Sequence, residues 1–217
     1  TVLLLTAWRL PEAQLAGVEA QTVSVELARR SILFNGIGER CSVRHGDFRD
    51  PASTAGLGPV DLVTGTPPYF RRGSGTESTR PQVGPCHFEH RGGLEDYVRA
   101  AARLVEDGGL LAFCLTAEQW GRVEEAASKG WTVESRLELV PREGKAPLLG
   151  VAALRRGAPV RPAEPPTTLV VRDRTGRWTP QFNGLRREMG LPPGDGEPEA
   201  EALCSDPVPR PMVGPGA

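Results

Sequence analysis

The sequence predicts an α/β fold built on a mostly parallel sheet with helices on both faces. One observation is that short apolar runs alternate with amphipathic segments over residues 15–128, which is typical of consecutive strand–helix units. Another is that the apolar runs 131–140 and 147–156 follow each other with no helical segment between them, so we expect them to pair antiparallel. A composition of 39% hydrophobic and 24% charged residues over 217 residues supports one domain with a real core.

The first part of the chain is expected to contribute a helix and several strands. Residues 1–10 are apolar and fit either a buried strand or a helix, since periodicity alone does not separate the two. A strand over residues 15–18 ends at Glu19, and a helix over residues 23–36 follows, with Thr22 at its N-cap and Gly36 beyond its last turn. Strands are expected over residues 41–45 and 60–65, joined by a Pro-, Gly- and Ser-rich loop over residues 50–59.

The second part begins with residues 71–93, which have no periodicity and are expected to form a long functional loop. Helices over 94–106 and 118–128 should flank a turn at 107–109 and a buried strand over 110–116, before the antiparallel pair. We therefore divide the chain into a main domain over residues 1–157, a linker over 158–166, and a strand and helix over 167–190 that pack on the core. The last segment, residues 191–217, is rich in proline, glycine and acidic residues and is expected to be a disordered tail.

Charge and cysteine usage narrow the class of protein. A net charge of −1 excludes a globally basic nucleic-acid binder, although a local basic patch is still allowed. The cysteines are far apart and form no C-x-x-C pair, which is typical of free thiols in a reducing cytoplasm. No apolar run approaches the roughly 18 residues of a membrane helix, and no signal peptide is visible. We expect a cytoplasmic monomer that does not associate with membranes.

The stretch Thr66, Pro67, Pro68, Tyr69 and Phe70 closes the strand over residues 60–65. A strand cannot continue through two prolines, because neither has a backbone N–H and both have φ near −65°. The strand must therefore end there and present carbonyls and aromatic rings at its carboxyl edge, where ligands bind in open α/β sheets. The plain alternative is a strand-ending turn whose tyrosine ring is buried in the core.

Together, these elements resemble the class I S-adenosylmethionine-dependent methyltransferases, whose sheet ends in an antiparallel hairpin. Glu19 ends a strand where that family keeps an acidic residue for the ribose hydroxyls of the cofactor. Asp47 and Phe48, in the sequence Gly-Asp-Phe, stand where the family binds the adenine amine with an acid and the ring with a backbone N–H. The resemblance implies S-adenosylmethionine as cofactor, bound by Glu19, Asp47, Phe48 and Thr66.

Three stretches are more narrowly similar to the bacterial family that methylates the exocyclic amine of an adenine beside the anticodon of valine tRNA. They are DLVTGTPPYF, HFEHRGGLEDYVRAAARLVEDGGLLAF and LVVRDRTGRWTPQF, and the likeness runs to about Leu191. Two departures stand out. Thr66 replaces an Asn or Asp, and no Asp-x-Gly-x-Gly turn precedes Thr1. We therefore expect an N-terminally truncated fold without the family's first strand and glycine-rich loop, in which residues 1–9 form the helix after that loop.

The chemistry expected at the double-proline stretch is activation of a planar nitrogen. An adenine amine is a poor nucleophile because its lone pair is delocalised, and two acceptors on its hydrogens free that lone pair. The carbonyl of Pro67 and the hydroxyl of Thr66 supply acceptors, while Pro68 keeps the corner rigid. Tyr69 can stack on a flipped-out base, and Phe70 widens that platform. The resemblance thus implies Thr66, Pro67, Pro68 and Tyr69 as catalytic residues.

Aromatic and cationic side chains after the corner are candidates for substrate binding. The residues expected to contact RNA are Phe70, Arg71, Arg72, Phe88 and Arg91. A plain charged loop explains the arginines equally well. His87 and His90 do not have the spacing of a zinc site and no thiol pair supports them, so no metal is expected. Further basic residues, at Arg172, Arg174, Arg177, Arg186 and Arg187, would form a second patch.

The sequence leaves three functions open. The first is an S-adenosylmethionine-dependent N-methyltransferase that acts on an adenine amine in tRNA. The second keeps the fold but methylates a glutamine amide in a protein or a guanine amine in rRNA, because Pro-Pro-Tyr turns serve planar nitrogens generally. The third is an inactive relic that binds RNA or a partner protein, which Thr66 and the absent glycine-rich turn favour.

Overall fold

The computed structural model describes residues 2–74, 84–128, 130–157 and 164–194. Its helices are α1 (Val2–Arg9), α2 (Thr22–Phe34), α3 (Pro51–Thr54), α4 (Gly84–His87), α5 (Leu94–Ala101), the 3-10 helix η1 (Ala117–Gln119), α6 (Trp120–Ala127) and α7 (Pro180–Glu188). Its strands are β1 (Leu15–Glu19), β2 (Cys41–His45), β3 (Val60–Gly65), β4 (Val105–Thr116), β5 (Trp131–Val140), β6 (Leu149–Arg156) and β7 (Thr167–Val170). Most of the predicted linker and tail lies outside the described residues.

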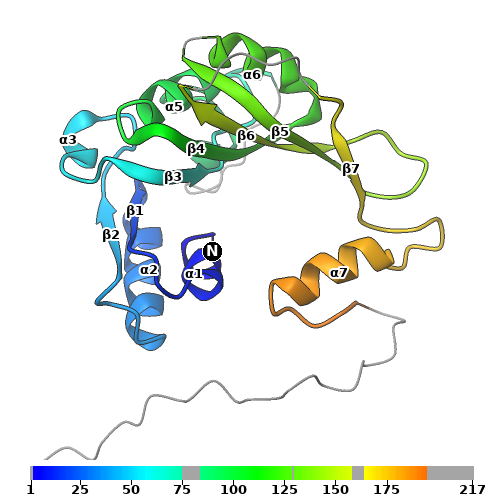
Figure 1. Cartoon of the computed structure of the whole chain (residues 1–217), viewed down its shortest axis with the longest axis horizontal. Coiled ribbons are helices and arrows are strands. Elements are labelled where there is room, and N and C mark those ends of the chain that lie inside the picture. Colours follow the sequence, from blue (N-terminus) through cyan, green and yellow to red (C-terminus); the bar gives the residue numbers. More distant parts are fainter. Residues whose placement is uncertain (1, 75–83, 129, 158–163, 195–217) are drawn as a thin grey trace, which may run out of the picture.

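The strands of the described ranges form two sheets (Figure 1). The larger sheet has the order β3-β4-β6-β5-β7, and β1 and β2 form a separate parallel pair. The pairs β3–β4 and β5–β7 are also parallel, whereas β6 runs antiparallel to both β4 and β5. The predicted α/β fold, with a mostly parallel sheet that ends in an antiparallel hairpin, is confirmed. Within the described residues, β1 pairs only with β2 and β3 only with β4.

The main core lies between the larger sheet and helices α5 and α6, which cover the same face of it (Figure 1). The period-two pattern of β4 explains the choice of face, because Leu111, Phe113 and Leu115 point to the helices and are at most 2% exposed. The alternate residues Ala112 and Cys114 are smaller and only half-buried on the opposite face. Helices were expected on both faces, but the large apolar side chains of β4 favour one.

Two segments differ from the predicted elements. The helix from Leu94 ends at Ala101, and β4 already begins at Val105. Residues 106–109 form an irregularity inside β4, where the register with β3 shifts and Gly108 has a φ of +83°. The predicted loop over 50–59 contains α3, which Asp50 caps by accepting the backbone N–H of Ala52.

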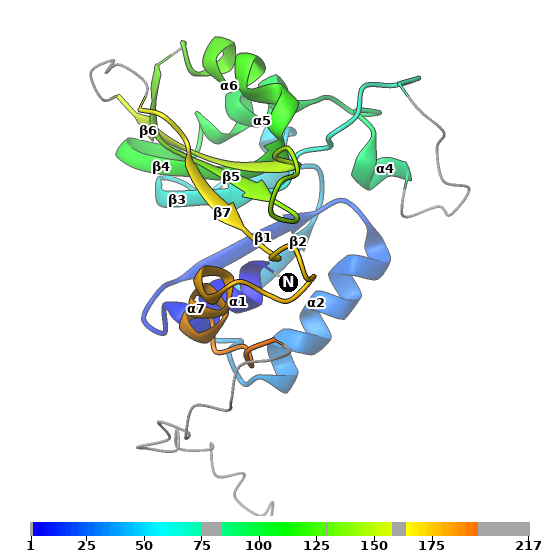
Figure 2. The same cartoon turned by 90° about the vertical axis from the view of Figure 1, so that its right-hand side faces the viewer.

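The N-terminal and C-terminal helices both lie below the larger sheet (Figures 1 and 2), and the segment after α7 reaches α1. Residues 1–10 contain helix α1 rather than a strand, and Trp8 of α1 lies where a Cβ at Gly190 would overlap its ring. The first residues of the predicted tail fold back on α7, since the backbone N–H of Gly194 donates to Asn183 Oδ1 at 2.9 Å. No helix in the described ranges has both the length and the apolar character needed to cross a membrane.

Candidate active site

The double-proline corner leaves the carboxyl end of β3 and opens toward solvent. Thr66 is exposed, Pro67 is buried, and Tyr69 is half-buried. Phe70 is 44% exposed. The tyrosine ring is therefore not sealed under the sheet, and burial raises its pKa so that the phenol stays protonated at neutral pH. Thr66 and parts of both aromatic residues at this strand end are therefore accessible to solvent.

Tyr97 on α5 holds the end of β3 in place. Its hydroxyl donates to the carbonyl of Thr64 at 3.2 Å. A Cβ at Gly65 would overlap that hydroxyl, which explains the glycine immediately before the corner. Burial raises the pKa of Tyr97 to about 12, so the group remains a donor throughout the physiological range. Sequence reasoning missed this role, because Tyr97 has the position of an ordinary apolar-face residue of α5.

The same tyrosine joins β2 to the corner. The ring of Phe48 packs on that of Tyr97 with centroids 4.7 Å apart, so the Gly-Asp-Phe turn after β2 lies against the helix that holds β3. A Cβ at Gly46 would overlap Ser53, which leaves the turn little freedom. Phe48 is partly buried against the main core. Its ring is structural, and the predicted cofactor role concerns its backbone N–H.

Asp47 is bound by a neighbouring guanidinium. Arg49 donates from Nε to Oδ1 at 2.7 Å and from Nη2 to Oδ2 at 2.6 Å. These hydrogen bonds hold the pKa of Asp47 below its usual range, and the charge of Arg91 acts in the same direction. Arg49 also donates to the carbonyl of Gly92 at 3.3 Å. Asp47 is thus a stable carboxylate connected to the segment that leads into α5.

Glu19 lies at the same edge as Asp47. It pairs with His45 in the parallel register of β1 and β2, and its carbonyl accepts the backbone N–H of Gly46 at 3.0 Å. Its carboxylate accepts the backbone N–H of Gln21 at 2.8 Å. Gln21 in turn donates to the Cys86 sulfur at 2.9 Å, which links the end of β1 to the segment after the corner. Both predicted cofactor acids are therefore connected to the corner region.

The loop that leaves the corner returns to it through a short parallel bridge between Phe70 and Phe88. The N–H of Phe70 donates to the His87 carbonyl at 2.9 Å, and the N–H of Glu89 donates to the Phe70 carbonyl at 2.8 Å. The two phenylalanine rings lie 5.6 Å apart. Phe88 was predicted to contact the substrate, but it is only 6% exposed and supports Phe70 from inside.

The predicted phosphate-binding arginines lie on the same loop. Arg71, Arg72 and Arg91 are all exposed. Arg71 lies near enough to Glu95 for its charge to contribute to lowering the pKa of that carboxyl. In the second patch, Arg172 and Arg186 lie over the Trp178 ring, with guanidinium carbons 5.4 Å and 3.9 Å from its centroid.

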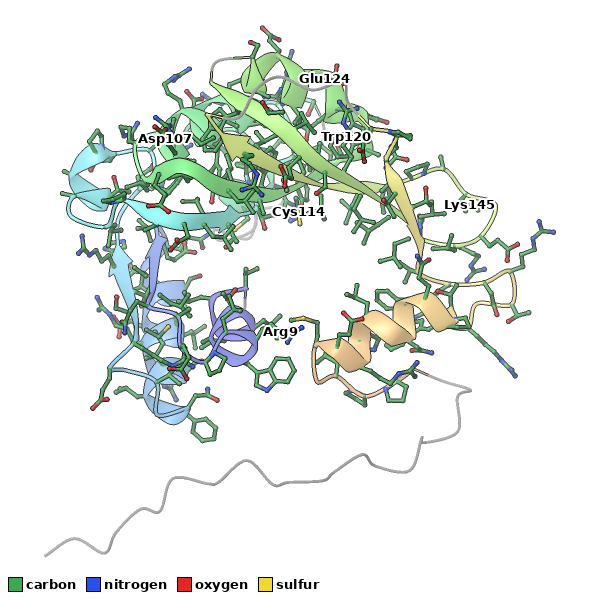
Figure 3. The ribbon with its side chains drawn as sticks, in the orientation of Figure 1. Arg9, Asp107, Cys114, Trp120, Glu124 and Lys145 are labelled. Atoms are coloured by element: carbon green, nitrogen blue, oxygen red, sulfur yellow. The ribbon has the colours of Figure 1, made fainter. Side chains whose placement is uncertain are left out.

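Residues from η1 and helix α6 complete the surroundings of the corner, and sequence reasoning missed them. Gln119 is buried, and Arg122 forms ion pairs with Glu89 and Glu95. Gln119 stands beside Thr116 and Glu118 in the sequence, so it has the pattern of an ordinary polar strand–helix junction and carried no signal of its own. Figure 3 shows the neighbouring Trp120 above the sheet and Cys114 on the opposite face of β4. No group of three or more metal-ligating side chains occurs in the described ranges.

The site has groups that suit S-adenosylmethionine. Carboxylates accept hydrogen bonds and cannot donate them when ionised, so Glu19 and Asp47 match the hydroxyl and amine donors of an adenosine. They end adjacent parallel strands, and the contacts of Phe48 with Tyr97 and of Tyr97 with Thr64 connect that edge to the corner. The residues present therefore fit the adenosine part of the cofactor.

Comparison with known proteins agrees with this geometry. A predicted O-methyltransferase from Agrobacterium tumefaciens superposes with a TM-score of 0.67 at 19% identity, over 86% of this chain and 83% of that protein, and so shares its fold. No protein-family model matches the chain.

Comparison with curated sequence relatives shows to which family the chain belongs. The tRNA1(Val) (adenine(37)-N6)-methyltransferase of Tolumonas auensis is 30% identical over 193 residues, which cover 87% of this chain and 76% of the relative. The protein of the same name from Porphyromonas gingivalis is 25% identical over 185 residues, which cover 83% and 72%. The predicted methyltransferase resemblance is confirmed, and the chain belongs to the tRNA1(Val) (adenine(37)-N6)-methyltransferase family of S-adenosylmethionine-dependent enzymes.

Proposed function

We propose that this methyltransferase modifies the exocyclic amine of an adenine in tRNA. The observation that carries the proposal is the open corner at the end of β3, where an exposed Thr66, a half-buried Tyr69 and the accessible ring of Phe70 follow one another. The names of the two curated relatives support tRNA as the acceptor and make adenine 37 of a valine tRNA the first acceptor to test.

The cofactor-binding part of the proposal assigns the two carboxylates at the ends of β1 and β2. Glu19 accepts hydrogen bonds from the ribose hydroxyls, and Asp47 accepts one from the adenine amine of the cofactor. Arg49 uses only part of the accepting capacity of Asp47, since a carboxylate offers about four lone-pair sites. The backbone N–H of Phe48 faces the adenine ring. When bound, S-adenosylmethionine supplies a methyl group that its sulfonium already makes electrophilic.

The catalytic part assigns the corner to the acceptor amine. The carbonyl of Pro67 and the hydroxyl of Thr66 each accept one amine hydrogen, which frees the nitrogen lone pair for attack. A threonine side chain is shorter than asparagine, but its exposure at the strand end lets the base approach it. Tyr69 stacks on the base after it leaves the RNA stack, and the rigid prolines hold these groups in position. The proton leaves after transfer, so no strong base is required.

RNA binding outside the target base is assigned to the arginines of the corner loop. Arg71 and Arg72 directly follow the corner, Arg91 lies on the segment that returns to it, and all three are exposed, so they contact phosphates and carry no base specificity. Phe88 is assigned a supporting role behind Phe70 because it is buried. In the second patch, Arg172 and Arg186 are engaged with Trp178. We therefore place the main phosphate contacts at the corner loop.

The test is methyl transfer from S-adenosylmethionine labelled in its methyl group. The purified protein is incubated separately with total tRNA, ribosomal RNA and total protein, and the products are digested and identified by mass spectrometry. We expect label in tRNA as N6-methyladenosine. Label recovered as methylguanine in ribosomal RNA or as methylglutamine in protein would replace the acceptor assigned here. A protein that binds no S-adenosylmethionine by calorimetry and labels nothing would contradict the proposed activity altogether.

A further inference from the structure

A buried amide lies directly behind the corner. Gln119 is 9% exposed and ends the 3-10 helix η1 after β4. Its Nε2 donates to the carbonyl of Tyr69 at 2.9 Å, and its Oε1 accepts the backbone N–H of Thr116 at 3.2 Å. The chemistry of the partners fixes which amide atom faces which, because a carbonyl can only accept and a backbone N–H can only donate. The side chain thus bridges the end of β4 and the corner.

A contact at the Tyr69 carbonyl can control how the rings of Tyr69 and Phe70 are oriented. The carbonyl belongs to the peptide unit between Tyr69 and Phe70, so rotation of that unit would redirect both rings. On the upstream side, the fixed φ angles of Pro67 and Pro68 restrict the chain. On the downstream side, the hydrogen bond from Gln119 is the restraint that reaches the Tyr69 carbonyl from another element. The tyrosine is therefore held from both directions.

One turn along the helix, Arg122 holds the returning end of the same loop. Its Nη1 lies 2.7 Å from Glu89, which follows the Phe70–Phe88 bridge, and its Nη2 lies 2.6 Å from Glu95 of α5. The Arg122 and Glu89 side chains are 16% and 14% exposed, so solvent screens this pair little. Gln119 and Arg122 therefore attach both ends of the loop to the start of α6.

We propose that Gln119 is a positioning residue that orients Tyr69 for stacking on the acceptor base, with Arg122 holding the other end of the loop. This inference rests on the proposed function, since it assigns Tyr69 to the base. Gln119 itself touches neither the base nor the methyl donor. Its effect on the reaction passes through the Tyr69 carbonyl, and so it should appear in turnover of the RNA substrate and not in cofactor binding.

The first test replaces Gln119 with leucine, which has a similar size but no hydrogen-bonding groups. We expect kcat with tRNA to fall by about 10- to 100-fold, the effect of a small misplacement near the reacting atoms, while the Kd for S-adenosylmethionine changes less than about twofold. A Gln14→Leu variant, altered at an exposed residue before β1, is the matched control and should keep the wild-type kcat. Wild-type kcat in Gln119→Leu, or an equal loss of cofactor affinity, would overturn the proposal.

The second test uses Gln119→Glu, which keeps the shape and changes the donor. An ionised carboxylate at position 119 cannot donate to the Tyr69 carbonyl, whereas a protonated carboxyl group can. Burial beside a carbonyl raises the pKa of an introduced carboxyl, so the ratio of variant to wild-type kcat should rise as the pH is lowered from about 8 to about 6. Burial raises the pKa of the Tyr69 phenol and the Cys114 thiol, so both stay neutral over this range. A ratio that does not change with pH would contradict the proposal.

Other charged groups near Gln119 also have to be considered when the pH is changed. The charged groups near this part of α6 include the network of Arg122, Glu89 and Glu95, the pair of Arg136 and Glu124, and Glu138, which accepts the indole N–H of Trp120. Hydrogen bonds from Arg122 lower the pKa of Glu95, so that carboxyl stays ionised between pH 6 and 8. His87 and His90 lie on the corner loop. All of these groups are present in both wild type and variant, so the ratio of their kcat values isolates the change at position 119. A purely structural Gln119 would change the melting temperature of the variants with pH without changing kcat per folded molecule. The kinetic ratio is measured well below the melting temperature, where the two effects separate.

Amide hydrogen exchange tests this inference independently of the proposed function. If the wild-type protein does not methylate tRNA, the proposed acceptor is wrong, but the restraint on the corner can still be measured. We expect the Phe70 amide, which donates to the His87 carbonyl, to exchange faster in Gln119→Leu than in Gln14→Leu. Unchanged exchange at Phe70 would show that the amide does not hold the corner, whatever the protein methylates.

Discussion

At the scale of single residues, Tyr69 connects the chemistry to the fold. Two prolines precede it, a buried amide binds its carbonyl, and its ring is only half-buried. Thr66 is exposed one step before the prolines, although an amide side chain would reach further. The sequence alone predicted the corner and its rings, because Pro-Pro after an apolar strand has few other structural uses. It did not predict Gln119, whose contact spans 50 residues along the chain.

Removing the Tyr69 ring should affect the RNA substrate selectively. We expect Tyr69→Ala to lower kcat/KM for tRNA by about 10- to 100-fold, the value of one base–aromatic stack, with the Kd for S-adenosylmethionine within a few-fold of wild type. Tyr69→Phe keeps the ring and should retain most of the activity. Steady-state kinetics and calorimetry measure the two quantities. An equal loss of both in Tyr69→Ala would show that the tyrosine is structural.

Gly65 should be intolerant of even one added methyl group. A Cβ there overlaps the Tyr97 hydroxyl that donates to Thr64, so we expect Gly65→Ala to cost about 1–3 kcal/mol of unfolding free energy. Gly121→Ala in α6 is the control, since a Cβ at that helical position meets no neighbouring atom, and it should gain about 0.5–1 kcal/mol. Urea unfolding measures both. A Gly65→Ala protein as stable as wild type would mean that Tyr97 does not hold the strand end.

At the scale of elements, the site depends on which strand ends lie together. The parallel pair β1–β2 places Glu19 and Asp47 at one edge, and the packing of Phe48 on Tyr97 connects that edge to β3. The continuous apolar run over residues 110–116 predicted a buried strand correctly. The early start of β4 at Val105 was missed, because Asp107-Gly108-Gly109 has the composition of a turn and only pairing with β3 draws it into the strand.

The ion pairs of Arg122 should make the protein sensitive to acid. The folded pKa of Glu95 is lowered by Arg122, so the stability it contributes is present above the ordinary glutamate pKa of about 4.3 and is lost as the pH falls through the folded pKa. We expect Glu95→Gln to be less stable than wild type at pH 7 and to approach it below about pH 3. Calorimetric melting temperatures between pH 7 and 3 test this.

A matched control for the acid experiment is Glu118→Gln, at an exposed residue of η1. Its melting temperature should follow the wild-type curve across the same pH range. If Glu95→Gln also runs parallel to wild type down to pH 3, the ion pair with Arg122 does not stabilise the fold.

At the scale of the whole molecule, both sheets and one layer of helices contribute residues to the candidate active site. The helices α5 and α6, with η1 before α6, cover one face of the larger sheet and also supply Tyr97, Gln119 and Arg122, so the main core and the corner are built from the same layer. The fold class was predictable from strand–helix alternation, which is local. The division into two sheets was not predictable, because local sequence patterns do not determine which distant strands pair with each other.

The central claim is that the corner acts on the amine of an adenine. It is tested most directly with two valine tRNA transcripts that differ only at position 37, where one has adenosine and the other inosine, which lacks the exocyclic amine. After incubation with the protein and S-adenosylmethionine, nucleoside mass spectrometry should detect N6-methyladenosine in the first transcript and no methylated base in the second. Equal methylation of both transcripts would contradict the claim.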